Sequence, residues 1–209
     1  NGVTERVVNQ LLTELDGLDQ RGSVFVYQGD ELGLPEAEVP YHLLKDPFGK
    51  AMWPEDKGRD GCRTPMPWQK DAPQCGFTKG QPWLPVSPKH RPLAVDAQEK
   101  DNNALLHAWR GFLHWRKQHP ELVKGDVTPL HASDAAIAYA RHMADAGMVV
   151  AVNLSDPPQI IPHPLFEKAE KLTGHGLQVA EASGKELTLP AYGIYLGRVP
   201  ASAIKEQMS

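Results

Sequence analysis

The strongest constraint on the fold is a proline-rich stretch between residues 35 and 92. It holds 11 of the chain's 19 prolines and three of its five tryptophans. Proline lacks a backbone N–H and fixes φ, so this stretch cannot form a long helix or a central strand. It also lacks the Ser, Gln and Lys bias of a disordered linker, and its large aromatic side chains would be poorly placed in water. We therefore predict a long, ordered loop that packs on the surface of a scaffold of regular elements.

The segment before this stretch predicts a helix and then a buried strand. Val7, Leu11 and Leu15 fall on one face of a helix over residues 4–16. Residues 24–27 are four apolar β-formers between turn signals, which is typical of a strand buried on both faces in a parallel sheet. Two carboxylates follow directly after that strand, at residues 30 and 31.

The second half of the chain predicts one long helix followed by a small antiparallel β domain. An apolar stripe that includes Leu105, Trp109 and Phe112 predicts a helix over residues 101–118, with Asp101 or Asn102 as its N-cap. Beyond residue 123 the pattern changes to short strands separated by Gly, Pro, Asn and Asp. The expected strands are Ala135–Met143, Gly147–Leu154, Gln159–Ile161, Glu186–Leu189 and Gly193–Val199.

Composition narrows the classes of partner. The net charge of -4 and the pI near 6.1 give no reason to expect a nucleic acid or an anionic membrane surface. No apolar run approaches the ~20 residues that a membrane-spanning helix needs. Cys62 and Cys75 lie without clustered histidines, so we expect no metal site and no cofactor. Two reduced thiols are favoured, and a single disulfide is the alternative.

Several motifs resemble one enzyme family. Residues 27–34, Tyr-Gln-Gly-Asp-Glu-Leu-Gly-Leu, resemble the end of the eighth barrel strand in α-glucosidases of glycoside hydrolase family 13. Residues 59–68, Arg-Asp-Gly-Cys-Arg-Thr-Pro-Met-Pro-Trp, resemble the following loop in oligo-1,6-glucosidases. Residues 189–195 are similar to the last strand of the family's C-terminal domain. The resemblance covers roughly residues 22–200.

The resemblance implies an α/β plus β fold. It consists of the last strand, loop and helix of a (β/α)8 barrel over residues 23–120, followed by a small antiparallel β-sandwich domain over residues 121–209. Residues 1–22 resemble instead the helix after the Walker B strand of AAA ATPases, so we hypothesise a fusion or chimera. The alternative is divergent glucosidase sequence in the preceding barrel helix. The chain has no Gly-x-x-x-x-Gly-Lys-Ser/Thr loop, so the AAA-like segment alone cannot bind nucleotide.

The resemblance also assigns site residues. The family's catalytic carboxylates lie on earlier barrel strands, so we expect no catalytic residue in this chain and a native N-terminus further upstream. Glu31 would hold the sugar in the leaving-group site and Arg59 would reach toward it, the alternatives being a loop cap and a bracing ion pair. Asp30 would either contact the site or support its turn. Arg63 is expected to bind loop carbonyls. Trp68 and Trp83 are expected in the loop core, the alternative being stacking on sugar rings.

These assignments predict the C-terminal part of a retaining α-glucosidase that acts on terminal α-glucosidic bonds of short oligosaccharides. An oligosaccharide would be the partner of the full-length parent, and the chain alone is expected to be inactive. The alternative is a non-catalytic carbohydrate-binding or structural module that needs a partner. A remote alternative is an interaction protein related to AAA ATPases. Linkage preference, compartment and oligomeric state stay open.

Overall fold

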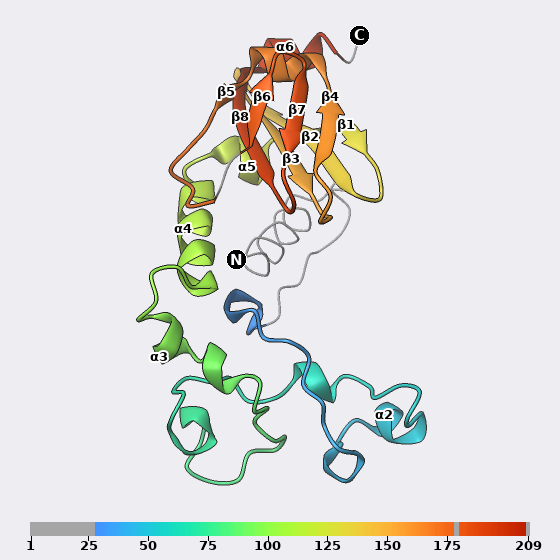
Figure 1. Ribbon diagram of the computed structural model, residues 1–209, viewed down its shortest axis with the longest axis vertical. Helices are drawn as coiled ribbons and strands as arrows, with labels where there is room; N and C mark the ends of the chain where they lie inside the picture. The colour runs from blue at the N-terminus through green and yellow to red at the C-terminus, as the bar shows by residue number, and fades with distance from the viewer. Residues whose placement is uncertain (1–27, 178–179, 208–209) are drawn as a thin grey trace. The chain divides into compact units, whose positions relative to one another are not determined.

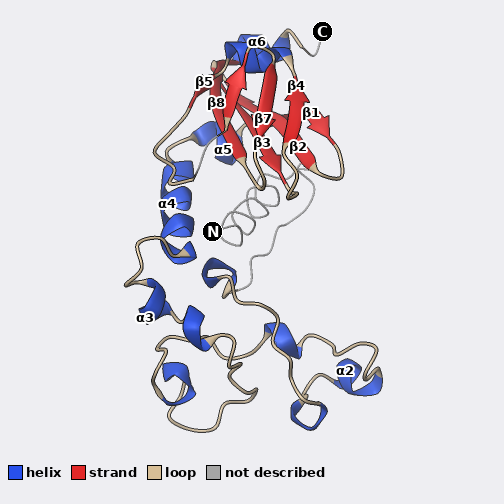
Figure 2. Cartoon of the chain, viewed as in Figure 1, coloured by secondary structure: helices blue, strands red, loops and turns tan. Residues whose placement is uncertain are grey.

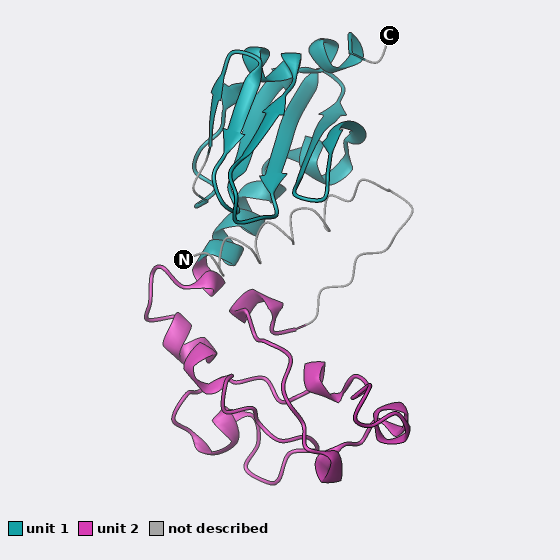
Figure 3. Cartoon of the chain, turned by 45° about the vertical axis from the view of Figure 1, so that its right-hand side comes forward, with its two compact units in different colours: residues 1–24, 108–209 teal, residues 25–107 magenta. Residues whose placement is uncertain are grey.

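A computed structural model of the chain describes residues 28–177 and 180–207, which fall into two compact units (Figure 3). One unit spans residues 25–107, and the other combines residues 1–24 with residues 108–209. The helix predicted over residues 4–16 and the strand predicted over residues 24–27 lie outside the described residues. Within the described ranges, no helix is long and apolar enough to cross a membrane. The predicted boundary between residues 120 and 121 stays a prediction.

The unit of residues 25–107 is a chain of turns and short helices, as Figure 2 shows. Between residues 28 and 100 it contains no strand and no helix longer than five residues, which confirms the prediction made from its prolines. Its elements are η1 (Asp30–Leu32), η2 (Tyr41–Leu43), α2 (Pro47–Ala51), η3 (Asp60–Cys62), η4 (Pro73–Gly76), η5 (Arg91–Leu93) and α3 (Val95–Gln98).

Among the described residues of this unit, two small apolar clusters form. Leu32, Met66 and Leu106 form one of them. The other consists of Val39, Leu44 and Leu84. With clusters this small, polar contacts carry much of the positioning within the unit.

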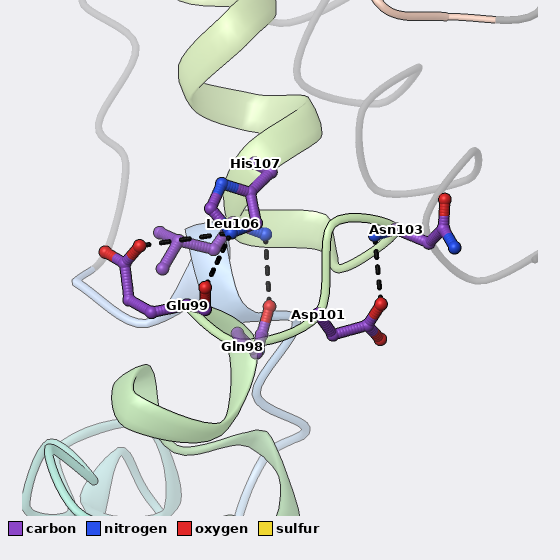
Figure 4. A network of polar contacts seen from close by, with 6 residues as sticks. All are labelled: Gln98, Glu99, Asp101, Asn103, Leu106 and His107. Atoms are coloured by element: carbon purple, nitrogen blue, oxygen red, sulfur yellow. Dashed lines mark hydrogen bonds and ion pairs between the residues drawn. The ribbon is translucent and has the colours of Figure 1, made fainter.

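The side chain of Gln98 is the best example of such a contact. Its Nε2 donates to the carbonyl oxygens of Leu32 (2.9 Å) and Leu93 (3.0 Å). Its Oε1 accepts from the backbone N–H of Leu106 at 3.0 Å, near the start of α4 (Figure 4). One buried amide therefore connects the turn η1 to the first turn of α4.

The long helix α4 spans Leu105–Lys117 and begins four residues later than predicted. The Asp101 carboxylate accepts from the backbone N–H of Asn103 (2.9 Å), so it closes its own turn rather than capping the helix (Figure 4). Gln98 supplies an acceptor for the first turn instead, because free N–H groups at a helix start need a partner. Trp109 and Phe112 are buried, which confirms the predicted apolar stripe.

The other unit contains two antiparallel sheets, labelled in Figure 1. A five-stranded sheet has the order β1-β2-β3-β8-β5, and a three-stranded sheet has the order β4-β7-β6. The strands are β1 (Asp126–Ala132), β2 (Ala136–Met143), β3 (Ala146–Asn153), β4 (Gln159–Pro162), β5 (Glu170–Lys171), β6 (Glu181–Ser183), β7 (Glu186–Leu189) and β8 (Ile194–Pro200). The remaining elements are α5 (Pro120–Lys124), η6 (Pro164–Lys168) and α6 (Ala201–Lys205).

One apolar core joins the two sheets, which confirms the predicted sandwich. It contains Ala138 and Val149 from the larger sheet and Ile161 and Leu187 from the smaller one, all with no exposed surface. The five predicted strands correspond to β2, β3, β4, β7 and β8. The edge strand β1 was not predicted as an element of its own. It contains Pro129, where the register shifts, and its burial does not alternate.

Candidate functional site

The candidate site begins at the turn η1. Gly29 has φ +114°, a conformation that side chains with a Cβ rarely adopt, and its carbonyl oxygen accepts from the N–H groups of Leu32 (3.0 Å) and Leu34 (3.2 Å). The Glu31 carboxylate accepts from the N–H of Gly29 at 2.8 Å. Glu31 therefore hydrogen-bonds its own turn, which agrees with the alternative role of a loop cap given above.

Arg59 is placed by two aspartates. Asp60 is completely buried, and its Oδ2 accepts from the backbone N–H groups of Lys45 (2.5 Å) and Asp46 (2.8 Å). Asp46 in turn accepts from the backbone N–H of Arg59 at 3.0 Å through Oδ2, and from that of Phe48 at 3.0 Å through Oδ1. The hydrogen bond from Arg59 holds the pKa of Asp46 below its usual range. The carboxylates therefore hydrogen-bond the loop backbone, and neither of them hydrogen-bonds the Arg59 guanidinium.

Two glycines allow the loop backbones to approach closely. A Cβ on Gly49 would lie 2.3 Å from the carbonyl oxygen of Lys57. A Cβ on Gly61 would lie 2.7 Å from the carbonyl oxygen of Ala37 and 2.8 Å from Oε1 of Glu36. These contacts bring Glu36 against the loop that carries Arg59.

The elements enclose an open cavity of about 310 Å³, which we call the inner cavity. Its lining includes Gln28, Asp30, Glu36, Arg59, Thr64 and His90. The structure brings two of the three predicted site residues, Asp30 and Arg59, to this cavity and leaves Glu31 outside its lining. The Arg59 guanidinium makes no hydrogen bond or ion pair with any described residue, so within the described part of the chain its donors face the cavity without a partner.

His90 is a lining residue that the sequence did not single out. It is 2% exposed, and its Nε2 donates to the carbonyl oxygen of Pro35 at 2.7 Å. Its Nδ1 lies 3.5 Å from the Thr64 hydroxyl and can accept a hydrogen bond from it. His90 and Pro35 are 55 positions apart, and no local pattern marks such a contact. Glu36 was missed for the same reason.

A second cavity of about 320 Å³, the outer cavity, lies beside the first. Gln28, Leu34, Cys62 and Thr64 line both. The remaining walls of the outer cavity are Arg63, Pro65, Met66, Phe77, Trp83 and Leu84.

Two expectations about these residues were wrong. The Arg63 guanidinium makes no hydrogen bond to a described residue, and only the backbone N–H of Arg63 bonds a loop carbonyl, that of Asp60 at 3.0 Å. The neighbouring loop closes through backbone contacts from Trp68 and Gln69 to the carbonyl oxygen of Cys75. Trp68 is 44% exposed and Trp83 is 66% exposed, so neither lies in a loop core. The apolar clusters of this unit are small and filled by aliphatic side chains. Sequence composition revealed the aromatic content of the loop but not the direction of the rings.

The cysteines form neither a disulfide nor part of a metal site among the described residues. Cys62 and Cys75 are both free thiols, as favoured from the sequence. Burial raises the pKa of the Cys75 thiol. In the described part of the chain, no three His, Cys, Asp or Glu side chains come together as a metal site. What the arrangement can do is recognise a polar ligand with guanidinium, carboxylate, amide and imidazole groups.

Comparison with known proteins identifies the chain's relatives. The family described as alpha amylase, catalytic domain, matches residues 4–125. A probable alpha-glucosidase from Rhizobium meliloti is 39% identical over 199 residues, covering 95% of this chain and 36% of that protein. An oligo-1,6-glucosidase from Parageobacillus thermoglucosidasius is 29% identical over 206 residues, covering 86% of this chain and 36% of that protein.

Solved structures agree with these relatives. The alpha-glucosyl transfer enzyme XgtA is 38% identical, with a TM-score of 0.83 over 95% of this chain and 36% of its own. An isomaltulose synthase from Erwinia rhapontici, solved with sucrose, is 21% identical with a TM-score of 0.73 over 93% of this chain and 37% of its own, which shows the shared fold.

The comparisons give the fusion hypothesis no support. The family match begins at residue 4 and so includes most of the segment that resembled an AAA ATPase. This favours the alternative, divergent sequence of the same enzyme family. The chain spans about 36% of the length of the curated relatives it matches. With the family match covering more than half of the chain, the protein belongs to the alpha-amylase catalytic domain family.

Proposed function

We propose that this chain forms the sugar-binding side of the active site in a retaining α-glucosidase that acts on terminal α-glucosidic bonds of short oligosaccharides. The observation that carries the proposal is the inner cavity, where the unengaged Arg59 guanidinium and the carboxylate-bearing residues Asp30 and Glu36 line the same space. The similarity to α-glucosidases and oligo-1,6-glucosidases supports the choice of substrate class.

The lining of the inner cavity suits sugar hydroxyls. A hydroxyl group donates one hydrogen bond and accepts others, so it is recognised by donors and acceptors placed side by side. Arg59 supplies fixed donors, Asp30 and Glu36 supply acceptors, and Gln28 supplies both. The volume lies at the lower end of the range for small-molecule sites, as expected for one sugar ring.

Bond cleavage would require groups beyond those assigned here. A retaining glycosidase uses a nucleophilic carboxylate and an acid/base carboxyl about 5–5.5 Å apart. We assign neither role to a residue of this chain, and we place both in the part of the parent enzyme that these 209 residues do not cover. The isolated chain is therefore expected to bind glucosyl units without cleaving the bonds between them.

The test combines a turnover assay with a binding assay. Purified chain should release no chromophore from a 4-nitrophenyl α-glucoside, and it should bind maltose or isomaltose by isothermal titration. Arg59→Ala should weaken binding by roughly 10- to 100-fold, since it removes a charged hydrogen-bond donor. Lys79→Ala, which removes an equal charge from an exposed position outside both cavity linings, is the matched control. Turnover at a normal enzymatic rate, or the absence of any sugar binding, would refute the proposal.

A second candidate is a carbohydrate-binding module that acts with a separate partner. It is favoured by the fact that the described lining of both cavities comes from one compact unit of this chain. Complementation distinguishes the two candidates. Supplying the segment of the Rhizobium meliloti relative that precedes the aligned region should restore hydrolysis if the chain is part of an α-glucosidase, and should restore none if it is a binding module.

A further inference from the structure

The most deeply buried titratable side chain in the lining of the inner cavity is that of His90, at 2% exposed. The backbone of His90 is fixed on both sides. Its N–H donates to the carbonyl oxygen of Ser87 at 3.0 Å, and its carbonyl oxygen accepts from the N–H of Leu93 at 3.0 Å. A buried ring on a backbone held at both ends has little freedom to turn, so the fold sets the directions of its two nitrogens.

Pro35 determines which nitrogen of the His90 ring carries the proton. Nε2 lies 2.7 Å from the carbonyl oxygen of Pro35, which can only accept, so Nε2 is the protonated nitrogen. In a neutral imidazole the other nitrogen then carries no proton and can only accept. Among the described residues, the group within reach of Nδ1 is the Thr64 hydroxyl at 3.5 Å. The hydroxyl group of Thr64 therefore directs its single proton at His90.

This hydrogen bond determines what Thr64 offers to a ligand. A hydroxyl group has one proton to donate and two lone pairs that accept. With the proton directed at Nδ1, the lone pairs remain, and Thr64 lines the inner cavity. We propose that His90 is a positioning residue for sugar binding, which fixes the Thr64 hydroxyl as a hydrogen-bond acceptor for a hydroxyl group of the sugar. This proposal rests on the function proposed for the inner cavity.

An imidazole in this position has two possible roles, and they depend on different nitrogens. Through Nε2, His90 ties Pro35 into the cavity wall, which is a structural role. Through Nδ1, it directs the Thr64 hydroxyl, which is the role proposed here. Amide side chains separate the two roles. In glutamine the amide nitrogen can replace Nε2 as a donor, whereas in asparagine the amide oxygen can replace Nδ1 as an acceptor.

Titration of the full 209-residue chain with maltose and isomaltose by calorimetry shows which nitrogen matters for binding. Thr64→Val removes the hydroxyl at nearly constant shape and should weaken binding by roughly 2- to 10-fold, the net value of one hydrogen bond. His90→Gln should weaken it by a similar factor, and the double variant should bind like either single variant, because both substitutions remove the same contact. His90→Asn keeps the acceptor and Thr64→Ser keeps the hydroxyl, so each should restore most of the affinity. Thr78→Val, a half-buried position outside both cavity linings, is the matched control.

Nitrogen NMR of isotope-labelled histidine rings measures the contact without any sugar. Among the nine histidines, the signals of His90 are those lost in His90→Gln and His90→Asn. The spectrum of the wild-type chain should show a neutral His90 ring that is protonated at Nε2. Thr64→Val should move the Nδ1 resonance and leave the Nε2 resonance in place, since Nε2 donates to Pro35. A purely structural role would leave the Nδ1 resonance unmoved.

Near-ultraviolet circular dichroism of each variant verifies that the unit stays folded, and Thr64→Val decides the question by NMR even if a His90 variant does not fold. Equal losses in the single and double variants, together with a moved Nδ1 resonance, support the positioning role. Losses that multiply in the double variant, or an Nδ1 resonance that Thr64→Val leaves unmoved, overturn that role but leave the proposed function standing. A wild-type chain that binds neither sugar overturns both.

Discussion

Asp60→Ala should loosen the loop that presents Arg59, because the lost carboxylate accepts two backbone N–H groups inside the unit. The N–H of Asp46 is buried, so leaving it without an acceptor costs about 1–3 kcal/mol. The N–H of Lys45 is partly buried, so water offsets part of its loss and the cost falls to about 0.5–1.5 kcal/mol. The total of about 1.5–4.5 kcal/mol corresponds to an increase of roughly 10- to 1,600-fold in local opening.

Amide hydrogen exchange measures this opening at the residues concerned. The N–H groups of Lys45, Asp46 and Arg59 should lose protection together, since Asp46 holds the backbone of Arg59 at 3.0 Å. Sugar affinity should fall in parallel, although Asp60 does not line the inner cavity.

Asp60→Asn is the matched control for the same experiment. The amide oxygen of asparagine can accept both N–H groups, so this variant should retain most of the protection and most of the sugar affinity. Unchanged exchange in Asp60→Ala would refute the reasoning, because it would mean that the carboxylate does not hold the loop. Equal losses in the alanine and asparagine variants would show that charge, rather than the acceptor geometry, is the important property.

Three further outcomes are expected. Burial lowers the pKa of His175, whose Nδ1 accepts from the N–H of Leu177 at 3.2 Å. Because the unfolded chain takes up a proton below about pH 6.5 and the folded chain does so only at lower pH, the free energy of unfolding in urea should be constant above that pH and decline as pH falls. His175→Gln should flatten the decline. Gly49→Ala should weaken sugar binding measurably by calorimetry, since its Cβ would lie 2.3 Å from the Lys57 carbonyl oxygen. Gly111→Ala in α4 meets no atom within 4 Å and should instead raise urea stability by about 1 kcal/mol.

The β sandwich could be predicted from the sequence because its signals are local. Alternation and turn residues mark the strands β2, β3, β7 and β8, and the same short range of residues that forms each strand also carries its pattern. The edge strand β1 was not predicted, because Pro129 and the register shift beside it break the alternation that marks the other strands.

The candidate site could be predicted only in part, because its geometry depends on contacts between distant residues. The position of Asp30 just after a predicted strand was enough to indicate it, and the resemblance of the loop motif was enough to indicate Arg59. Glu31 follows the same sequence rule as Asp30, yet its carboxylate bonds to Gly29 two residues back. His90 reaches the cavity through a hydrogen bond to Pro35, which no local pattern encodes.

Arg59 and Asp60 show why a motif does not disclose the roles of its members. They are neighbours in the chain, both charged, and equally suited to contact a sugar. The structure separates them: Asp60 is fully buried and accepts from the backbone N–H groups of Lys45 and Asp46, whereas Arg59 lines the cavity and its guanidinium bonds no described residue. A buried carboxylate needs hydrogen bonds to offset its desolvation, and the backbone N–H groups of a loop without strands need acceptors. At Asp60 the buried carboxylate accepts from the N–H groups of the loop, which stabilises both. The loop therefore keeps its shape without a hydrogen bond from the side chain of Arg59.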